Sequence, residues 1–498
     1  MDQRPLDMGR FVVEHFDLSN QHQEAIDLRS KVISFDLYES IYKKFVHGQV
    51  LIGDAQDLIK NLRLTGQEFL HIKLSQKEAF GEQAEDIFSI DKNFRIYAIE
   101  NVDRSKDGQR LTQSYWMKII SPRAYTCANT RIQKVFRGSW SNILQRVLLD
   151  EVGMAKEEID HWEPTEKSNY QFICPNWTSG EMIDWCVSNA SPHEKDGDGF
   201  RNSFFFFESM NGKFQFKSFK EMCDSQFPVN FDFTPRVFDD PSDMPPLNAS
   251  GGLNSQIISY MKPNVFNTFE GMKNGAYASE MLVYDPTLKL MSSRVFNLAD
   301  MYKEKIVDGK PQKGAHVSGS YPMISLEDEI WLTTSPSISD TVPPSLKKLY
   351  NVIELNLTKQ FPANVVYDIN MAHAFDNEEH GKKEAFTGIV NGDARRLERK
   401  ALLEILQQNK ILVKIPFRTD IRAGNKIQLD LGHAQKADSK TKSDELNDGL
   451  YLITAIVFNG STIRTQGTLT LTCVKESFAK NVKDVKPLDS ITAAEVEG

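Results

Sequence analysis

The chain has 498 residues, which is too long for a single hydrophobic core, so several domains are expected. Its composition, 40% hydrophobic and 26% charged, is ordinary for a globular protein, and 31 phenylalanines favour sheet-rich packing. The net charge is -9 and the sequence pI is about 5.7. This balance disfavours a protein that grips nucleic acid, because phosphate binding needs clustered Lys and Arg. An acidic chain can still line a passage along which DNA slides.

The sequence also indicates in which cellular compartment the protein is found. The first residues contain no apolar core of signal-peptide length, and no stretch approaches the roughly 18 apolar residues of a membrane span. The sequence therefore predicts a protein that has no membrane partner and stays dissolved in a cytoplasm. The five cysteines are odd in number, far apart and never in a C-x-x-C pair. We expect them to be reduced, mostly buried thiols.

Residues 1–123 have the pattern of a small antiparallel barrel or sandwich. The strand-like segments are KVISFDLYESIYKKF, QVLIGDAQDLI, EFLHIKL, NFRIYAIENVD and QSYWMKIISP, with Gly and Asp turns between them. Four or five strands at such short spacing are typical of a barrel.

Residues 124–248 change to an α+β pattern. A helix is predicted over GSWSNILQRVLLDEVG, where Ser139 is the expected N-cap. A second helix is predicted over NWTSGEMIDWCVSNA, where Thr178 and Glu181 have the spacing of a capping box. This region is therefore predicted to be an α+β insertion.

A phenylalanine run closes this insertion. SFFFFES and KFQFKSF flank Asn211-Gly212 and predict a β-hairpin. The run Phe204 to Phe207 could be an aromatic platform for a sugar or a base. We favour a strand buried on both faces, because the run lacks interleaved Arg or Lys.

The remaining chain returns to strands with one irregular interruption. Residues 249–300 are predicted to form the first part of a second barrel, and residues 400–476 its remainder. Residues 301–399, rich in Gly, Pro, Ser and charge, are predicted to be an irregular insertion that ends in the helix DARRLERKALLEILQQN. Residues 477–498 alternate charged and small residues and are predicted to be a C-terminal tail.

The closing strands of the second barrel show the pattern most clearly. Ile427, Leu429 and Leu431 alternate with polar residues, which predicts a strand with one buried face. Leu469 and Leu471 alternate with threonines in the same way. Together with DGLYLITAIVFN, these segments predict an antiparallel meander.

Signatures of catalytic and phosphate-binding sites are absent from the sequence. G-x-x-x-x-G-K-[ST], G-x-G-x-x-G, G-x-S-x-G and H-E-x-x-H do not occur. No pair of carboxylates can be picked out as glycosidase acids. The sequence therefore predicts no enzyme, no catalytic residue, no cofactor and no metal site.

Three weaker clusters could bind a metal. His373 and His380 have Glu378 and Glu379 nearby, but seven residues span about 10.5 Å of helix, too far for two imidazoles on one zinc ion. A solvated segment is the favoured interpretation there.

The other two clusters are also more easily explained without a metal. Three cysteines and one histidine could converge on zinc: Cys174, Cys186, Cys223 and His193. Their spacing lacks the paired knuckle form. Asp196 and Asp198 in KDGDG could begin a calcium loop, but later ligands are missing, so a turn is favoured.

The order of these segments resembles one known family, the central baseplate hub proteins of contractile-tailed phages. FDLYESIYKKFVHGQVLIGDAQDLIKNLRLTGQEFLHIKL resembles the family's opening. Seven positions carry this likeness: Glu39, Ser40, Ile41, Asp54, Leu64, Gly66 and Glu68. FRGSWSNILQRVLLDEVG, PNWTSGEMIDWCVSNA and FFFFESMNGKFQFKSF are similar to the helices and hairpin that follow, and the closing strands fit the last barrel. The resemblance covers most of residues 30–475 and is thin between 301 and 392. The family often has His where this chain has Phe458.

The resemblance implies a fold and a role. The expected fold class is α+β, mainly β, with two small antiparallel β-barrels of tail-tube type and α+β insertions. A homotrimer would arrange six barrels in a ring that joins a six-fold tail tube to a three-fold central spike. The implied partners are tail tube or tube-initiator proteins, the spike protein and baseplate wedge proteins. DNA would pass through the channel without specific binding, in a virion baseplate assembled in the host cytoplasm.

Two alternatives remain open from the sequence. The first is a spike or tail adaptor of a type VI-like secretion system, which has related barrels; a long β-helix after the barrels would favour it. The second is a spike-associated cell-wall hydrolase, which a convergent acid pair or Ser/His/Asp set would favour. The sequence shows neither feature.

Overall fold

The structure is a computed structural model, and every structural statement refers to the residues that it describes. These residues are 9–20, 23–75, 89–107, 110–166, 169–192, 203–224, 230–232, 257–264, 266–286, 289–302, 305–307, 310–312, 316–319, 321–322, 364–369, 372–375, 392–431, 447–463 and 465–479. Within them, no helix has both the length and the apolar character needed to cross a membrane.

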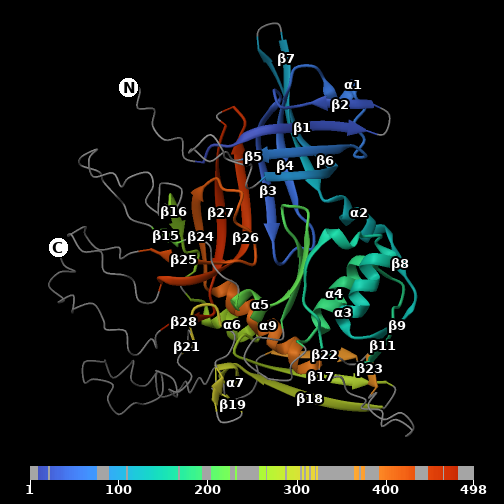
Figure 1. Ribbon diagram of the computed structural model, residues 1–498, viewed down its shortest axis with the longest axis vertical. Coiled ribbons are helices and arrows are strands. Elements are labelled where there is room, and N and C mark those ends of the chain that lie inside the picture. Colours follow the sequence, from blue (N-terminus) through green and yellow to red (C-terminus); the bar gives the residue numbers. More distant parts are fainter. Residues whose placement is uncertain are drawn as a thin grey trace, which may run out of the picture.

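A 13-stranded sheet forms the centre of the molecule, and its strands come from two distant parts of the chain. The N-terminal strand group has the spatial order β2 (Gln23–Asp27), β1 (Val12–Asn20), β5 (Phe69–Ser75), β6 (Ser89–Asp107), β7 (Arg110–Ile120), β4 (His47–Asp54) and β3 (Val32–Ser40). The C-terminal strand group continues with β26 (Gly449–Ser461), β27 (Gln466–Val474), β24 (Lys410–Pro416) and β16 (Ser259–Met261), while β25 (Lys426–Asp430) and β15 (Asn230–Asp232) attach through β26. Figure 1 shows the blue and the red strands side by side.

The two groups meet where β3 pairs antiparallel with β26, which we call the seam. The pairing runs from Ala455 opposite Ser40 to Ser461 opposite Ser34. Asn459 donates a side-chain hydrogen bond of 2.6 Å to Asp36 across the seam. Buried residues of both groups form one common hydrophobic core, so the groups are packed together as well as hydrogen-bonded.

Period-two alternation explains why these segments are strands. In β3 and β4, residues such as Phe35, Leu37, Val50 and Ile52 are fully buried and alternate with half-buried neighbours. The same holds at the C-terminal end, where Ile427, Leu429, Leu469 and Leu471 are buried as the sequence predicts. Each group therefore contributes one apolar face to the common core.

The α+β insertion packs beside the sheet. Its helices are α2 (Pro122–Asn129), α3 (Trp140–Arg146) with a following π-helical turn (Val147–Glu151), a 3-10 turn (Lys156–Glu158), α4 (Ser179–Asn189) and α5 (Phe219–Asp224). Its strands are β8 (Arg131–Ile132), β9 (Val135–Gly138), β10 (Ile159–Trp162), β11 (Asn169–Ile173), β12 (Trp177–Thr178), β13 (Phe204–Glu208) and β14 (Phe214–Ser218). Figure 1 shows this unit in green and cyan at one end of the large sheet.

The predicted helix and hairpin signals of the insertion are confirmed. Ser139 caps α3 by accepting a hydrogen bond from the Asn142 N–H. Thr178 and Glu181 form the capping box of α4. Gly212 has φ +77° in the β13–β14 turn, a conformation in which a residue with a Cβ is strained.

A third unit lies below the insertion in Figure 1 and contains a three-stranded sheet of order β18 (Leu290–Asn297), β17 (Ala278–Asp285) and β22 (Asn364–Ile369). The helix α9 (Gly392–Gln408), which the sequence predicts, covers one face of this sheet. The remaining short elements are α1 (Leu58–Asn61), α6 (Thr268–Asn274), α7 (Ala299–Tyr302), β19 (Lys305–Val307), β20 (Lys310–Gln312), β21 (Tyr321–Pro322), β23 (Ala372–Phe375) and β28 (Ser477–Phe478).

The architecture is mainly β, as expected, but two separate barrels are not confirmed. Among the described residues, strand pairing runs as an open path from β2 to β16 and closes neither group. The reason lies at the seam, because an edge strand of each group pairs with the other group.

The observed strands also differ from the predicted strands in two places. Of the residues within 249–300 that the structure describes, only those of β16 join the large sheet, while β17 and β18 pair with β22 in the third unit. The strands β1 and β2, which the sequence pattern does not predict, extend the N-terminal group. The domain boundaries themselves stay a prediction.

Candidate functional site

The three-stranded sheet of the third unit has one covered and one open face. On the covered face, Met281, Val283 and Phe296 are buried against Leu402 and Ile405 of α9. A strand turns alternate residues to opposite sides, so the intervening residues of β17, β18 and β22 point away from the helix. The alternation that directs every second residue of these strands toward α9 therefore directs the others to the open face.

Most of the residues on the open face are apolar. Strand register places its residues in three rows: Val295, Glu280 and Val365; Ser293, Leu282 and Tyr367; Met291, Tyr284 and Ile369. Tyr367 is 74% exposed, Val295 68% and Met291 66%. We call the six large apolar residues of these rows with high exposure the exposed sheet face: Tyr284, Met291, Val295, Val365, Tyr367 and Ile369.

Such a face has the character of a binding surface. Contiguous apolar patches are uncommon on monomeric proteins and often mark contacts with other proteins. Each large apolar side chain that a partner buries contributes about 1.5–3 kcal/mol. Among the described residues, β18 and β22 are also the edges of this sheet, so a further strand could pair there.

A buried polar junction fixes the insertion against the N-terminal strand group. Glu208, at the end of β13, is 2% exposed. Its carboxylate accepts hydrogen bonds from the Val46 N–H at 3.1 Å and from Ser121 Oγ at 3.0 Å, and it forms an ion pair with Lys92 of β6. Breaking such a buried pair leaves an uncompensated charge, so the junction tolerates little movement.

Glu39 forms a second buried contact, between β3, the β13–β14 turn and the segment before β25. Its two carboxylate oxygens accept from the Met210 N–H at 2.6 Å and from the Ala423 N–H at 2.7 Å. Burial raises the pKa of Glu39, and Arg422 and these two N–H groups oppose that rise. The contact joins segments that are hundreds of residues apart in sequence.

The other acidic residues of the family resemblance also bind backbone groups. Asp54 accepts from the Leu58 N–H at 2.6 Å, and Glu68 accepts from the N–H groups of Thr65 and Gly66 at 2.8 Å each. Gly66 has φ +85°, a conformation that favours glycine. These carboxylates shape turns, which explains their spacing in the sequence.

The phenylalanine run is a strand buried on both faces, as predicted. Phe204 and Phe206 pack into the core of the insertion, whereas Phe205 and Phe207 pack into the core that contains α9. The Arg399 guanidinium of α9 lies 4.8 Å from the Phe205 ring centroid. The strand β13 therefore separates two cores and connects the insertion to the third unit.

The cysteines are buried and free, as predicted. Cys174 and Cys186 belong to the insertion core, while Cys223 belongs to the core with α9. Burial raises the pKa of the Cys127 thiol to about 11 and the pKa values of the other four thiols too. Protonated thiols are poor nucleophiles and poor metal ligands.

Several weaker candidates lie outside the described residues: His193, Asp196, Asp198, Glu378, Glu379 and His380. His373 lies in β23, which pairs with β11 of the insertion. In the part of the chain that the structure describes, one group of side chains has metal-ligand spacing, and it contains His15, Asp17 and His71. None of these three was singled out from the sequence.

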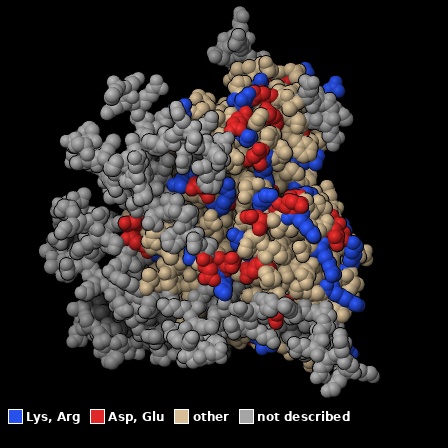
Figure 2. All heavy atoms as spheres, in the orientation of Figure 1, with Lys and Arg blue, Asp and Glu red and all other residues tan. Residues whose placement is uncertain are grey.

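The charged side chains have no single-sign field on the face drawn in Figure 2, where acidic and basic groups lie next to one another. A surface that grips nucleic acid through phosphates concentrates Lys and Arg in a stripe or patch. Over most of the drawn face the two signs are mixed, so no extended basic patch is seen there.

Comparisons with known proteins were made for sequence and for fold. No family model matches the chain, and no curated protein matches it. Among solved structures, a tail protein from Neisseria meningitidis MC58 is 7% identical, with 94% of this chain and 98% of that chain covered and a TM-score of 0.48. The 43 kDa tail protein of prophage MuSo2 from Shewanella oneidensis is 7% identical, with coverages of 93% and 98% and a TM-score of 0.45. The E. coli c3393 protein, described as a component of the type VI secretion system, is 8% identical, with coverages of 93% and 78% and a TM-score of 0.39.

Proposed function

We propose that this chain is a structural subunit of a phage-type tail and acts as its central hub. In this role three copies form a ring between a six-fold tail tube and a three-fold spike. The ring leaves a channel through which DNA passes without being held. The residues Glu39, Asp54, Gly66 and Glu68, which carry the resemblance to the hub family, support the proposal because each occupies a defined structural position.

The observation that carries the proposal is the pairing of two strand groups within one chain. The N-terminal group contributes seven strands and the C-terminal group six, and they share a sheet and a core. A trimer of such chains presents six strand groups around its axis, which is what a partner with six-fold symmetry requires. In the part of the chain that the structure describes, the sheet ends at β2 and β16 are open, and such edges could pair with neighbouring copies.

The exposed sheet face supports a role in assembly. It is held on α9, which is packed against the insertion through Arg396 and Arg399. A rigid apolar surface on a fixed helix suits contact with another protein, such as a spike or wedge protein. The proposal assigns no catalysis to the chain, and the engagement of its buried acids with backbone N–H groups supports this.

Size and symmetry of the purified full-length chain test the proposal. Three copies of the 56.7 kDa chain have a mass of about 170 kDa, measurable by sedimentation velocity, and electron microscopy should show a three-fold ring with six similar lobes. A chain that stays monomeric at all concentrations, with and without the spike protein of the same tail, contradicts the proposal. Cell-wall hydrolysis that one point substitution abolishes would also contradict it.

A further inference from the structure

Three potential metal ligands lie together on the outward face of the N-terminal strand group. His15 and Asp17 are two residues apart on β1, so both point to the same side of the sheet. His71 of the neighbouring strand β5 lies directly opposite Asp17 in the strand register. The spacing of strands therefore brings residues that are far apart in sequence to one spot.

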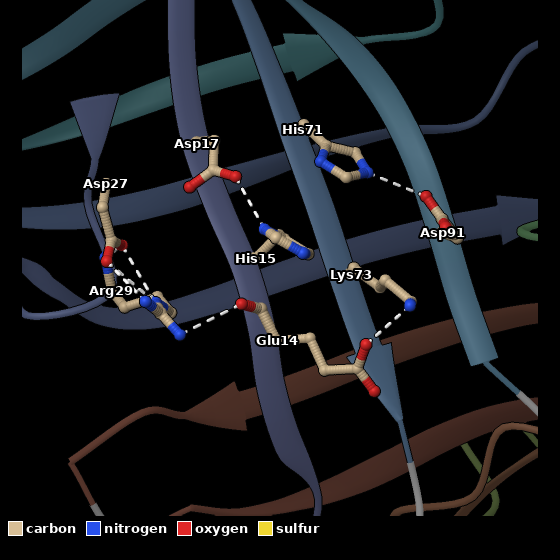
Figure 3. Close-up of polar contacts among 8 residues, drawn as sticks. All are labelled: Glu14, His15, Asp17, Asp27, Arg29, His71, Lys73 and Asp91. Carbon is tan, nitrogen blue, oxygen red and sulfur yellow. Dashed lines mark hydrogen bonds and ion pairs between the residues drawn. The ribbon is translucent and has the colours of Figure 1, made fainter. Parts of the chain in front are cut away.

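The distances among these side chains are those of a compact cluster. The ring atom Nδ1 of His15 lies 2.7 Å from Asp17 Oδ2, and the two imidazole rings stack with centroids 5.3 Å apart. One ligand atom from each of the three residues lies within 4.8 Å of the other two. Figure 3 shows Asp17, His15 and His71 facing a common point between β1 and β5.

We propose that His15, Asp17 and His71 bind a divalent first-row transition ion, with zinc as the ion that best fits the ligands. Two imidazoles and one carboxylate are a common zinc ligand set, which leaves one position for water or a further ligand. Two ligand atoms on one tetrahedral zinc ion are about 3.3 Å apart when each bond is about 2.0 Å. A separation of 2.7 Å between the His15 and Asp17 atoms therefore has to widen by only a fraction of an ångström.

Asp91 orients His71 for this role. Its Oδ1 lies 2.8 Å from His71 Nε2, on the strand beyond β5, so the ring presents its other nitrogen, Nδ1, toward Asp17 and His15. A carboxylate that accepts from the far ring nitrogen of a histidine ligand fixes its tautomer and its orientation. Asp91 is therefore a positioning residue.

The nearby cations are already engaged with other acids. Lys73, opposite His15 in the register, forms an ion pair of 2.6 Å with Glu14. Arg29 forms an ion pair with Asp27 and donates to the Glu14 carbonyl oxygen at 3.2 Å. Their charges are balanced locally, so Asp17 remains available to an incoming cation.

A bound ion would fasten β1 to the rest of the sheet. The pairing of β1 with β5 is irregular between Val13 and His15, immediately before the cluster. A ligand that binds only the folded protein raises its stability by mass action. The ion would thus hold an edge-proximal strand at the point where its register changes. The sequence motifs predict no metal site, and this proposal departs from that expectation.

Titration of the untagged full-length chain with zinc, after removal of bound metal by a chelator, tests the proposal. Isothermal titration should give one ion per chain, and cobalt in place of zinc should give the intense visible bands of a tetrahedral site. His15→Gln and His71→Gln should each lower the affinity at least tenfold, and Asp91→Asn should lower it about tenfold. The thermal midpoint of the parent chain should rise with zinc, and that of the two histidine variants should not.

His161→Gln is the matched control. His161 is a similarly exposed histidine on β10 with an acidic neighbour, Glu221, at 3.8 Å, and it lies outside the cluster. Its substitution should leave zinc affinity unchanged. The proposal is overturned if the chain binds no zinc, or if His15→Gln and His71→Gln bind it as tightly as the parent chain does. Since His15 is exposed and His71 only half-buried, circular dichroism should show unchanged folding in both variants.

Discussion

Glu39 joins three segments through two backbone hydrogen bonds, and this makes it a sensitive position. Glu39→Gln keeps the size of the side chain but turns an N–H₂ group toward a buried backbone N–H of either Met210 or Ala423. An unsatisfied buried donor costs about 1–3 kcal/mol, so the thermal midpoint should fall clearly. Glu100→Gln is the control, because its side chain is 51% exposed and lies 3.6 Å from Lys118. Equal midpoints for the two variants would show that the Glu39 contacts do not hold these segments together.

The Arg123–Glu158 pair should make stability depend on pH. Burial opposes ionisation of Glu158, but hydrogen bonds from Arg123 and from the Ala155 N–H overcome it and lower the pKa below 4.5. Because the pKa is lowered in the folded state, this carboxylate stabilises the protein above about pH 4.5 and loses its effect as pH falls through the folded-state value. Arg123→Gln should therefore lower the thermal midpoint at neutral pH and matter little once the pH has fallen below the folded-state pKa of Glu158. Melting curves across this range check the prediction; a difference that persists undiminished in acid contradicts it.

Sequence patterns predict an interaction correctly where all of its residues lie within a short stretch of chain. The Ser139 cap and the Thr178–Glu181 box need only three or four neighbouring residues. The His15–Asp17–His71 cluster was missed because its two histidines lie on different strands, and the strand β1 was itself missed. The pattern His-x-Asp in a strand, which turns both side chains to one face, was the available signal.

At the scale of single strands, the closing segments offer a direct test of the predicted register. Ile427→Asp and Leu469→Lys each place a charge in the common core, where both parent residues are buried. A buried unpaired charge costs several kcal/mol, a large share of the ~5–15 kcal/mol that stabilises a domain. Hydrogen exchange should show lost protection in β24 to β27 first, with the distant strands β1 and β5 affected least.

Asp430→Lys is the control for this strand experiment. Asp430 is exposed on the same strand as Ile427, so its substitution changes charge without burying it. Protection should remain as in the parent chain. If Asp430→Lys disrupts the group as strongly as Ile427→Asp does, charge rather than burial explains the loss.

The exposed sheet face should govern association rather than folding. Tyr367→Lys combined with Val295→Lys replaces two of its most exposed residues, and surface substitutions usually change stability by no more than about 0.5 kcal/mol each. We expect a nearly unchanged thermal midpoint but weaker self-association or weaker binding to tail partners in sedimentation experiments. Ile463→Lys is the control, because Ile463 is 75% exposed in the β26–β27 turn and belongs to another surface. Unchanged association in the double variant would exclude this face from the assembly.

The sequence pattern identified strands more reliably than it identified their partners. Strands are correctly predicted over GAYASEMLVYD and KLMSSRVFNL. These strands, however, pair with each other and with β22 in a separate sheet. Alternation shows that a segment has one buried face but does not show which other segment covers it. Packing against α9 determines where these two strands lie.

At the scale of the whole molecule, the pairing of β3 with β26 at the seam could not be predicted from the sequence. It joins residues 34–40 to residues 455–461, and no local pattern couples segments so far apart. The same pairing explains why the expected barrels form one open sheet path. Two strand groups in one chain were predicted from the return of short strands, and the structure adds that they share a core.

The last prediction concerns the seam itself. Gly460 of β26 lies opposite Phe35 of β3, and a Cβ built at Gly460 would lie 2.6 Å from Phe35 Cε1 and 2.9 Å from Cε2. Phe35 cannot easily move aside, because it is fully buried against Phe11 and Phe16. Gly460→Ala should therefore cost about 1–3 kcal/mol through overpacking and loosen the two strand groups from each other.

The matched control is Gly180→Ala in α4, where the nearest atoms to an added Cβ are 3.9 Å away. This change should leave stability unchanged or raise it slightly, because alanine favours the helix. Hydrogen exchange should show faster opening of β3 and β26 in Gly460→Ala alone. If the proposed ring depends on two strand groups held in one sheet, the same variant should also lose the trimer, while Gly180→Ala keeps it. A Gly460→Ala chain that opens at the seam and still forms trimers would mean that each group assembles independently, and the shared sheet would then have no part in the three-fold to six-fold match.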